Sequence, residues 1–235
     1  MSRLTSTTRP LRLFSESGKW RSIGSSQADR AEAQQVVAAL FDDWATRWNI
    51  PWFDKRLSNI SPYSNLDRSR LAAVAAITPD MTILYNQRQL ARVEAVGTRH
   101  ALAIMGHFTT IKQFPTVISV IRAAWLPDVE ADPFNPNTQN GGRPPLEYFV
   151  PIRDSAAFDG PNTPHKVRVV AKGAPFEVNL KDDVFVLYSV GSDNAKNNAV
   201  NVQNTAEVVQ GADYLIWPPV VSLVRQHMLD EGQIK

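Results

Sequence analysis

The first half of the chain has apolar residues at helical spacing. Between Asp29 and Trp48, apolar side chains recur about every three to four residues, and both Ser26 and Asp29 are residue types that favour the start of a helix. Pro51 predicts the end of this helix, because proline disfavours helical geometry in the residue that precedes it. A second, shorter helical segment is predicted to end near Ile77.

A much longer helix is predicted from about Pro79 to Lys112. Its apolar positions again follow the helical period, and proline is tolerated in the first turn of a helix. Gly97 and Gly106 interrupt the pattern, so we expect each of them either to weaken the helix or to let a neighbouring element pack closely. Phe114-Pro115 predicts the end of this helix.

From Asp128 onward the pattern changes to short apolar runs separated by residues that favour turns. The runs are predicted to be strands: Leu146–Pro151, Val167–Val170, Phe176–Asn179, Val184–Ser189 and Tyr214–Trp217. A long loop is expected at 192–210, a short helix at 117–125 and a last helix within 218–229. Helices first and strands last favour an α+β fold: N-terminal helices, one of them long, followed by a small antiparallel sheet with long loops.

These patterns divide the chain into three regions. Residues 1–26 have few apolar anchors and are predicted to form a flexible arm. Residues 27–88 are predicted to be a helical region, and residues 89–235 an α+β module.

Composition narrows the classes of function. The chain has 25 basic and 23 acidic side chains, so no cluster of positive charge predicts binding to nucleic acid. It has no cysteine, which excludes disulfides, thiolate metal sites and a cysteine nucleophile. No apolar run approaches the roughly 18 residues of a membrane span, and no apolar segment typical of a signal peptide opens the chain.

The acidic residues give little support to a catalytic site. Asp182 and Asp183 are adjacent before a strand, where successive side chains diverge, so they are poor candidates for paired-carboxylate catalysis. Asp128, Glu130 and Asp132 precede a turn, and we interpret them as solvated or as weak cation ligands. The chain also lacks a nucleophile elbow. We therefore expect a protein that is not an enzyme, with an unrecognised hydrolase as a minor alternative.

Tryptophan is concentrated near the end of the first helix. Trp44, Trp48, Trp52 and the neighbouring Phe53 are predicted to form an aromatic cluster. One interpretation is a staple within the core, and the other is an exposed patch that binds a protein partner.

A series of short motifs follows in order along the C-terminal half. They are helix ends at Phe114-Pro115 and Trp125-Leu126-Pro127, a turn at Asp132-Pro133-Phe134, a strand at Leu146–Phe149, and a strand that enters the turn Gly191-Ser192-Asp193-Asn194. This order resembles the major pseudopilins of type II secretion, over roughly residues 89–218. It is also similar to a group of larger bacterial envelope proteins of unassigned function, in which a helical region precedes a pseudopilin-like end.

The resemblance implies a calcium site, because the corresponding pseudopilin loop encloses a calcium ion. Calcium takes about six to eight oxygen ligands, and this loop offers the carboxylates of Asp193 and Asp213 and the carbonyl of Val190, with Glu207 as a further acid. The family's glycine after the loop aspartate is Asn194 here, which adopts left-handed geometry at modest cost. The alternative is that Asp193 forms a local turn with the backbone and Asp213 caps a strand.

The function implied by the resemblance is structural. We expect a non-enzymatic assembly protein of the bacterial periplasm or cell envelope, with protein partners or self-assembly and with calcium as its one cofactor. The alternative is an accessory subunit of a larger secretory or viral complex. Such a subunit would dock through the N-terminal arm and through Trp44, Trp48 and Trp52.

Overall fold

The computed structural model describes residues 24–137, 142–170, 175–191, 193–203 and 211–234. Almost all of the predicted flexible arm lies outside the described residues. The chain divides into two compact units, one made of the described residues up to Ile50 with Asp54–Ile83, and the other of Pro51–Phe53 with Leu84–Lys235. Each unit is described by itself.

The first unit contains the first predicted helix. Helix α3 spans Arg30–Asn49, and the carboxylate of Asp29 accepts a hydrogen bond of 2.8 Å from the Glu32 amide at its N-terminus. The helix ends immediately before Ile50 and Pro51, as predicted. The 3-10 helix η1 spans Lys55–Ser58 and α4 spans Ala72–Ile77, and the buried residues Leu40, Leu71 and Val74 pack together in this unit.

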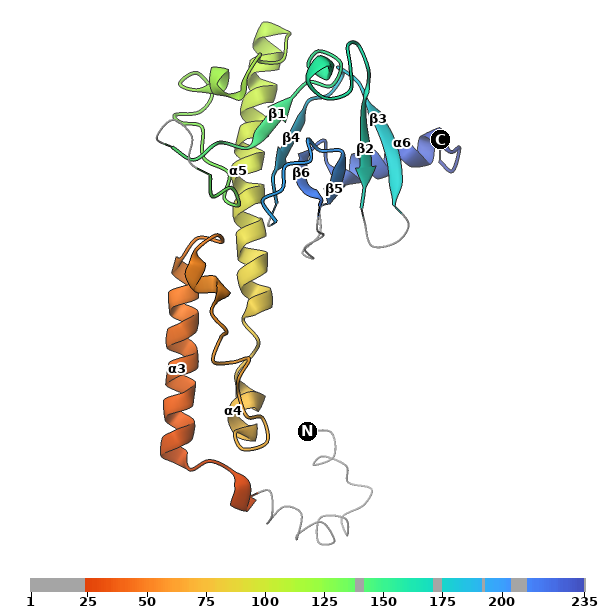
Figure 1. Ribbon diagram of the computed structural model, residues 1–235. Coiled ribbons are helices and arrows are strands. Elements are labelled where there is room, and N and C mark those ends of the chain that lie inside the picture. Colours follow the sequence, from red (N-terminus) through yellow and green to blue (C-terminus); the bar gives the residue numbers. More distant parts are fainter. Residues whose placement is uncertain (1–23, 138–141, 171–174, 192, 204–210, 235) are drawn as a thin grey trace. The chain divides into compact units, whose positions relative to one another are not determined.

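The long helix is present and dominates the view in Figure 1. Helix α5 spans Thr82–Ile111, and the Asp80 carboxylate accepts a hydrogen bond of 2.9 Å from the Thr82 amide. Its first two residues belong to the first unit and the remainder to the second. After the helix, the predicted short helix at 117–125 is instead a single 3-10 turn, η2, at Ile118–Ile121.

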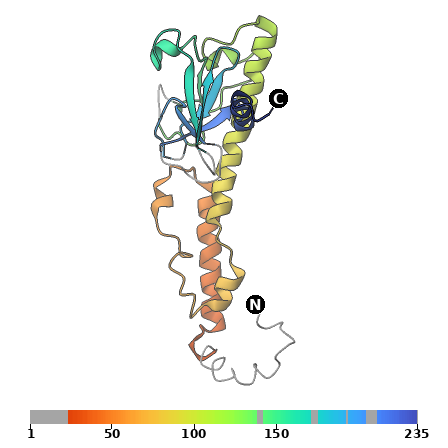
Figure 2. The ribbon, with the colours of Figure 1, turned by 90° about the vertical axis from the view of Figure 1, so that its right-hand side faces the viewer.

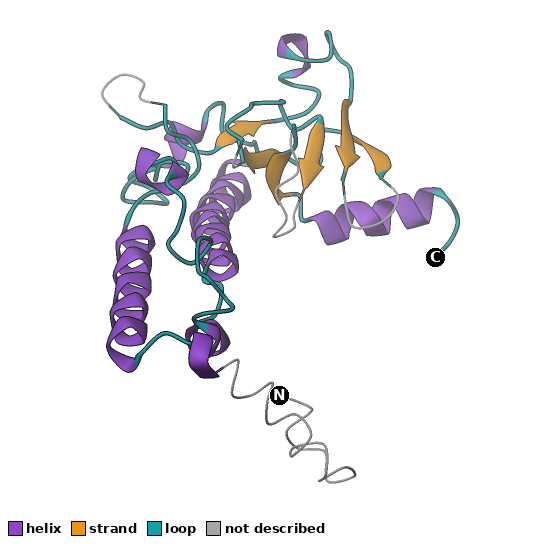
Figure 3. Ribbon diagram, turned by 60° about the horizontal axis from the view of Figure 1, so that its bottom comes forward, coloured by secondary structure: helices purple, strands orange, loops and turns teal. Residues whose placement is uncertain are grey.

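The second unit contains a six-stranded sheet whose strand order is β1-β4-β6-β5-β2-β3. The strands and the last helix are β1 at Glu147–Phe149, β2 at His165–Val169, β3 at Phe176–Leu180, β4 at Val186–Ser189, β5 at Asn201–Gln203, β6 at Asp213–Trp217 and α6 at Val220–Asp230. Helices precede most of the strands along the chain, so the fold belongs to the α+β class (Figure 3).

The sheet differs from the prediction in one strand. The expected loop at 192–210 contains β5, which pairs in parallel with β2 on one side and with β6 on the other. All other pairs are antiparallel, so the sheet is mixed rather than purely antiparallel.

Alternate residues of the central strands belong to two different cores. Leu187 and Ile216 pack in a cluster with Val93 and Ile104 of α5, which runs alongside the sheet in Figures 1 and 2. Their neighbours Val186, Tyr188 and Leu215 belong to a second cluster, which also contains Leu223 of α6. Because successive strand residues point to opposite faces, β4 and β6 are buried on both sides. Within the described ranges, no helix is both long enough and apolar enough to cross a membrane.

Candidate functional site

The turn after β4 has the local geometry that its sequence predicts. Gly191 and Asn194 both have left-handed backbones, with φ of 74° and 54°, and the Asn194 amide donates to the Gly191 carbonyl at 3.3 Å. The Asp193 carboxylate accepts a hydrogen bond of 3.1 Å from the Ala195 amide, two residues further along. This contact is an Asx turn, the local arrangement that was expected of Asp193 as the alternative to a metal site.

Asp193 also connects the two ends of the loop. Its second carboxylate oxygen accepts a hydrogen bond of 2.7 Å from the Gly211 amide, 18 residues away. The loop therefore closes through a single side chain, two residues before β6 begins. Ser192 and residues 204–210, which include the predicted further acid Glu207, lie outside the described residues.

Asp213 holds the same loop from the start of β6. Its side chain is fully buried, and one carboxylate oxygen accepts hydrogen bonds of 2.7 Å from the Ala199 amide and 3.1 Å from the Asn197 amide. Burial raises the pKa of Asp213 to about 6; the two amides oppose this shift, and the negative charges of Asp193 and Glu147 add to it. The buried carboxylate thus lies near two other acids, of which Glu147 is paired with Lys196 at 2.8 Å.

Val190 contributes to this region through Asp132, a residue that the sequence analysis assigned wrongly. Asp132 is fully buried rather than solvated, and its carboxylate accepts hydrogen bonds from the Ser189 hydroxyl at 2.8 Å, the Phe134 amide at 2.9 Å and the Val190 amide at 3.2 Å. Burial raises its pKa, which these hydrogen bonds and the charge of Arg143 partly offset. The Asp-Pro-Phe turn therefore supports the loop directly, a role that no local signal in the sequence predicts.

The predicted calcium ligands Asp193, Asp213 and Val190 lie in one loop, and they fit an ion in part. Burial is the main cause of the raised pKa of Asp213, and the negative charges of Asp193 and Glu147 add to it. Each of the two carboxylates already accepts backbone N–H groups but keeps further lone pairs. In the part of the chain that the structure describes, no three His, Cys, Asp or Glu side chains lie close enough together to hold a metal ion.

The three predicted partner-binding tryptophans are divided between the two units. Trp44 is 7% exposed and lines a small apolar pocket of the first unit with Leu40, Tyr63 and Met81. Trp48 is half-buried in the same unit.

Trp52 belongs to the other unit, where it is partly buried and packs against the core. Its ring stacks on Tyr85 with centroids 5.9 Å apart and meets Phe134 edge-on at 5.3 Å. Phe134 follows the buried Asp132 in the same turn, so Trp52 supports the segment that holds the loop.

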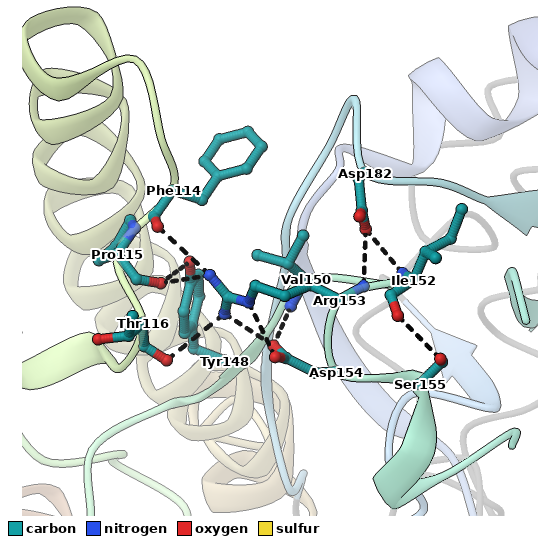
Figure 4. Close-up of polar contacts among 10 residues, drawn as sticks. All are labelled: Phe114, Pro115, Thr116, Tyr148, Val150, Ile152, Arg153, Asp154, Ser155 and Asp182. Atoms are coloured by element: carbon teal, nitrogen blue, oxygen red, sulfur yellow. Dashed lines mark hydrogen bonds and ion pairs between the residues drawn. The ribbon is translucent and has the colours of Figure 1, made fainter. Parts of the chain in front are cut away.

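An arginine clamp joins the segment after α5 to the region after β1 (Figure 4). Arg153 donates to both carboxylate oxygens of Asp154, at 2.8 and 2.7 Å, and to the carbonyl of Pro115 at 2.8 Å. Tyr148 donates its hydroxyl to the same Pro115 carbonyl at 2.8 Å. Asp182 accepts hydrogen bonds from the amides of Ile152 and Arg153 at 2.7 and 3.1 Å, so its carboxylate acts in the clamp.

One further pair has the composition of a catalytic dyad. His165 and Asp159 approach to 2.6 Å between ring nitrogen Nδ1 and a carboxylate oxygen. The imidazole is fully buried between the rings of Phe149 and Phe158, and its Nε2 has no hydrogen-bond partner among the described residues. The contacts of the pair among the described residues are therefore ring packing and one hydrogen bond.

Comparison with protein-family models, with curated proteins and with solved structures finds no significant match to this chain.

Proposed function

We propose that this chain is a non-enzymatic structural or assembly protein of the bacterial cell envelope, with a pseudopilin-like C-terminal module. The supporting observation is the set of hydrogen bonds that Asp132 makes with Ser189 and Val190. They join the Asp-Pro-Phe turn to the start of the terminal loop, and these two motifs are 57 residues apart in the sequence. Two pieces of the motif order thus meet in one buried site.

The physical role that we propose for this arrangement is to fix the described ends of the loop. Asp132, Asp193 and Asp213 each accept backbone N–H groups from segments that have no regular pairing of their own. Ordering a segment before it meets a partner lowers the entropic cost of association. Loop ends that are ordered in advance are therefore suited to assembly.

We further propose that calcium reinforces this loop, with Asp193, Asp213 and the carbonyl of Val190 as ligands. The charge that accumulates around Asp213 supports the proposal, because a bound cation stabilises neighbouring carboxylates in their ionised form. Binding to the folded state alone would add directly to the free energy of unfolding.

Thermal unfolding in EDTA, in calcium and in magnesium tests the metal and the loop together. Calcium at ~100 times its dissociation constant should raise the free energy of unfolding by about 2.7 kcal/mol, and Asp193→Ala should abolish the rise. Asp183→Ala is the matched control, because Asp183 is an exposed acid of the same unit. An equal response to magnesium, or a full response in Asp193→Ala, would contradict the assignment.

A second candidate is an accessory subunit that docks through the first unit and the N-terminal arm. The observation in its favour is that Phe41, Ile60 and Ile77 of this unit are 55%, 71% and 70% exposed. Sedimentation of the full chain beside a variant that lacks residues 1–26 discriminates the two. Docking through the arm predicts that the deletion abolishes larger species, whereas an unchanged compact monomer argues against it.

A further inference from the structure

An open groove of about 410 Å³ lies along α5 in the second unit. Small-ligand sites occupy roughly 300–1,000 Å³, so the groove is large enough for a small molecule. Its lining includes Gln89, Arg92 and Arg99 of α5, together with Glu130, Pro133 and Arg143 from the segment that follows. It is separate from the loop that contains Asp193 and Asp213.

The charge of the groove is positive once its ion pair is taken into account. Arg99 donates to both carboxylate oxygens of Glu130 at 2.7 Å, so these two side chains neutralise each other. The buried Asp132 opposes part of the charge of Arg143. Arg92 makes no ion pair among the described residues, so the groove keeps a net positive charge.

Arg143 is fixed in place. Its guanidinium donates to the backbone carbonyls of Asn135, at 2.9 Å, and of Asp132, and it lies 4.6 Å above the ring centroid of Phe53. These contacts use only part of its N–H groups. Burial lowers the pKa of Arg143, and the positive charge of Arg92 lowers it further, whereas the charge of Asp132 raises it. The two guanidinium groups are therefore close enough to repel each other.

Arg92 and Gln89 provide donors that have no acceptor. Arg92 is exposed and makes no hydrogen bond or ion pair within the described residues. Gln89, one turn earlier, is 1% exposed, and its Nε2 is buried without a hydrogen-bond partner in the described part of the chain. A buried donor without an acceptor is unfavourable, and native proteins seldom retain one.

We propose that this groove binds a small anionic ligand through a carboxylate or phosphate group, held by Arg92 and Arg143 and accepting from the amide of Gln89. Guanidinium groups bind both kinds of oxyanion with paired hydrogen bonds. The ligand supplies the acceptor that Gln89 lacks and the negative charge that the two arginines lack.

Isothermal titration calorimetry of the full chain with citrate and, separately, with pyrophosphate tests the site. Low ionic strength is used because salt screens exposed charges. Binding of one ligand per chain is expected for at least one probe, and the probe that binds more tightly identifies the oxyanion. Failure of both probes to bind at millimolar concentration would overturn the proposal.

Variants separate a built site from general attraction to a basic surface. Arg92→Gln should weaken binding about tenfold, the effect of one lost charge-assisted hydrogen bond. Arg225→Gln, an exposed helical arginine of α6 in the same unit, is the matched control and should change nothing. Equal weakening by both variants would show non-specific binding and refute the site.

Gln89→Leu gives an independent readout. The substitution keeps a similar volume and removes the donor that lacks an acceptor, so the unfolding midpoint should not fall, whereas binding should weaken. A lower midpoint with unchanged binding would show that Gln89 only supports the fold. Should this variant fail to fold, Arg92→Gln still decides, because Arg92 is exposed.

Discussion

Single carboxylates hold the irregular segments of the second unit. Asp132, Asp193 and Asp213 each bind backbone amides that no strand partner satisfies. A buried amide without an acceptor costs about 1–3 kcal/mol, so each of these side chains stabilises a segment that would otherwise expose its backbone to water. Burying a charged carboxylate is itself unfavourable, and this raises the pKa values of the two fully buried residues, Asp132 and Asp213.

Asp213 makes stability depend on pH. Its pKa is about 6 in the folded chain, above its ordinary value of 3.8, so the folded state binds more protons between these two values. The protonated form of Asp213 therefore stabilises the folded state. This contribution to the free energy of unfolding is fully present below about pH 4 and is lost as the pH rises to about 6. We expect Asp213→Asn to remove this decline, measured as the difference between wild type and variant in urea unfolding at a series of pH values.

The control for this prediction is Asp183→Asn, at an exposed acid of the same unit, which should leave the slope unchanged. A decline of the same size in Asp213→Asn would show that another group carries it. Saturating calcium should reduce the decline in the wild type, because a cation at Asp213 lowers its pKa.

Residue roles were predictable from the sequence where local chemistry determines them. The left-handed backbone of Asn194 and the turn at Asp193 follow from the preferences of these two residue types. The burial of Asp132 does not, because aspartate is usually exposed and its partner Ser189 is 57 residues away. Only the packing of the whole unit brings the two together.

The same distinction holds for the elements. Helix α5 and the strands β1 to β4 and β6 were predicted because their apolar positions repeat over several residues. Strand β5 was missed because it has only three residues, Asn201–Gln203, and its parallel partners lie far away in sequence. The mixed sheet and the candidate groove along α5 follow from such distant contacts, which a periodic pattern does not show.

Gly97 sets how closely α5 approaches β6. A Cβ placed on this glycine would lie 2.6 Å from two side-chain carbons of Ile216, closer than packed atoms allow. Alanine favours a helix by about 1 kcal/mol over glycine, yet we expect Gly97→Ala to lower the free energy of unfolding by about 1–3 kcal/mol because it overpacks this contact. Urea unfolding monitored by circular dichroism measures the change.

A double-mutant cycle identifies the cause of that loss. Ile216→Ala creates space at the same contact, so the pair Gly97→Ala and Ile216→Ala should be less unstable than the sum of the single variants. Strict additivity would show that Gly97 acts through the helix backbone rather than through Ile216. If Gly97→Ala instead raised the free energy of unfolding, α5 and β6 would have moved apart to accommodate the Cβ, and the prediction would be wrong.

The whole chain consists of two units with separate cores. The motif content of the sequence predicts a boundary at 88/89, whereas the structure divides the chain at 83/84, within α5. A continuous helix has no change of composition at such a point, so the sequence contains no local signal for it. Trp52 shows the same limit, since it lies beside the first unit in sequence and packs in the second.

Unequal cores predict two unfolding transitions. The largest buried cluster of the first unit has three residues, including Leu40, whereas the second unit has two larger clusters, one of which contains Ile104. The first unit should therefore melt at the lower temperature in scanning calorimetry, because less apolar surface is removed from water. Leu40→Ala and Ile104→Ala, at residues 1% and 0% exposed, should each cost about 2–5 kcal/mol.

Each of these substitutions should shift only the transition of its own unit, Leu40→Ala the lower one and Ile104→Ala the upper one. A single transition that both substitutions shift by the same amount would show instead that the two cores unfold together. Calcium adds a third test of the same assignment. Because Asp193 and Asp213 lie in the second unit, the metal should raise the upper transition and leave the lower one in place.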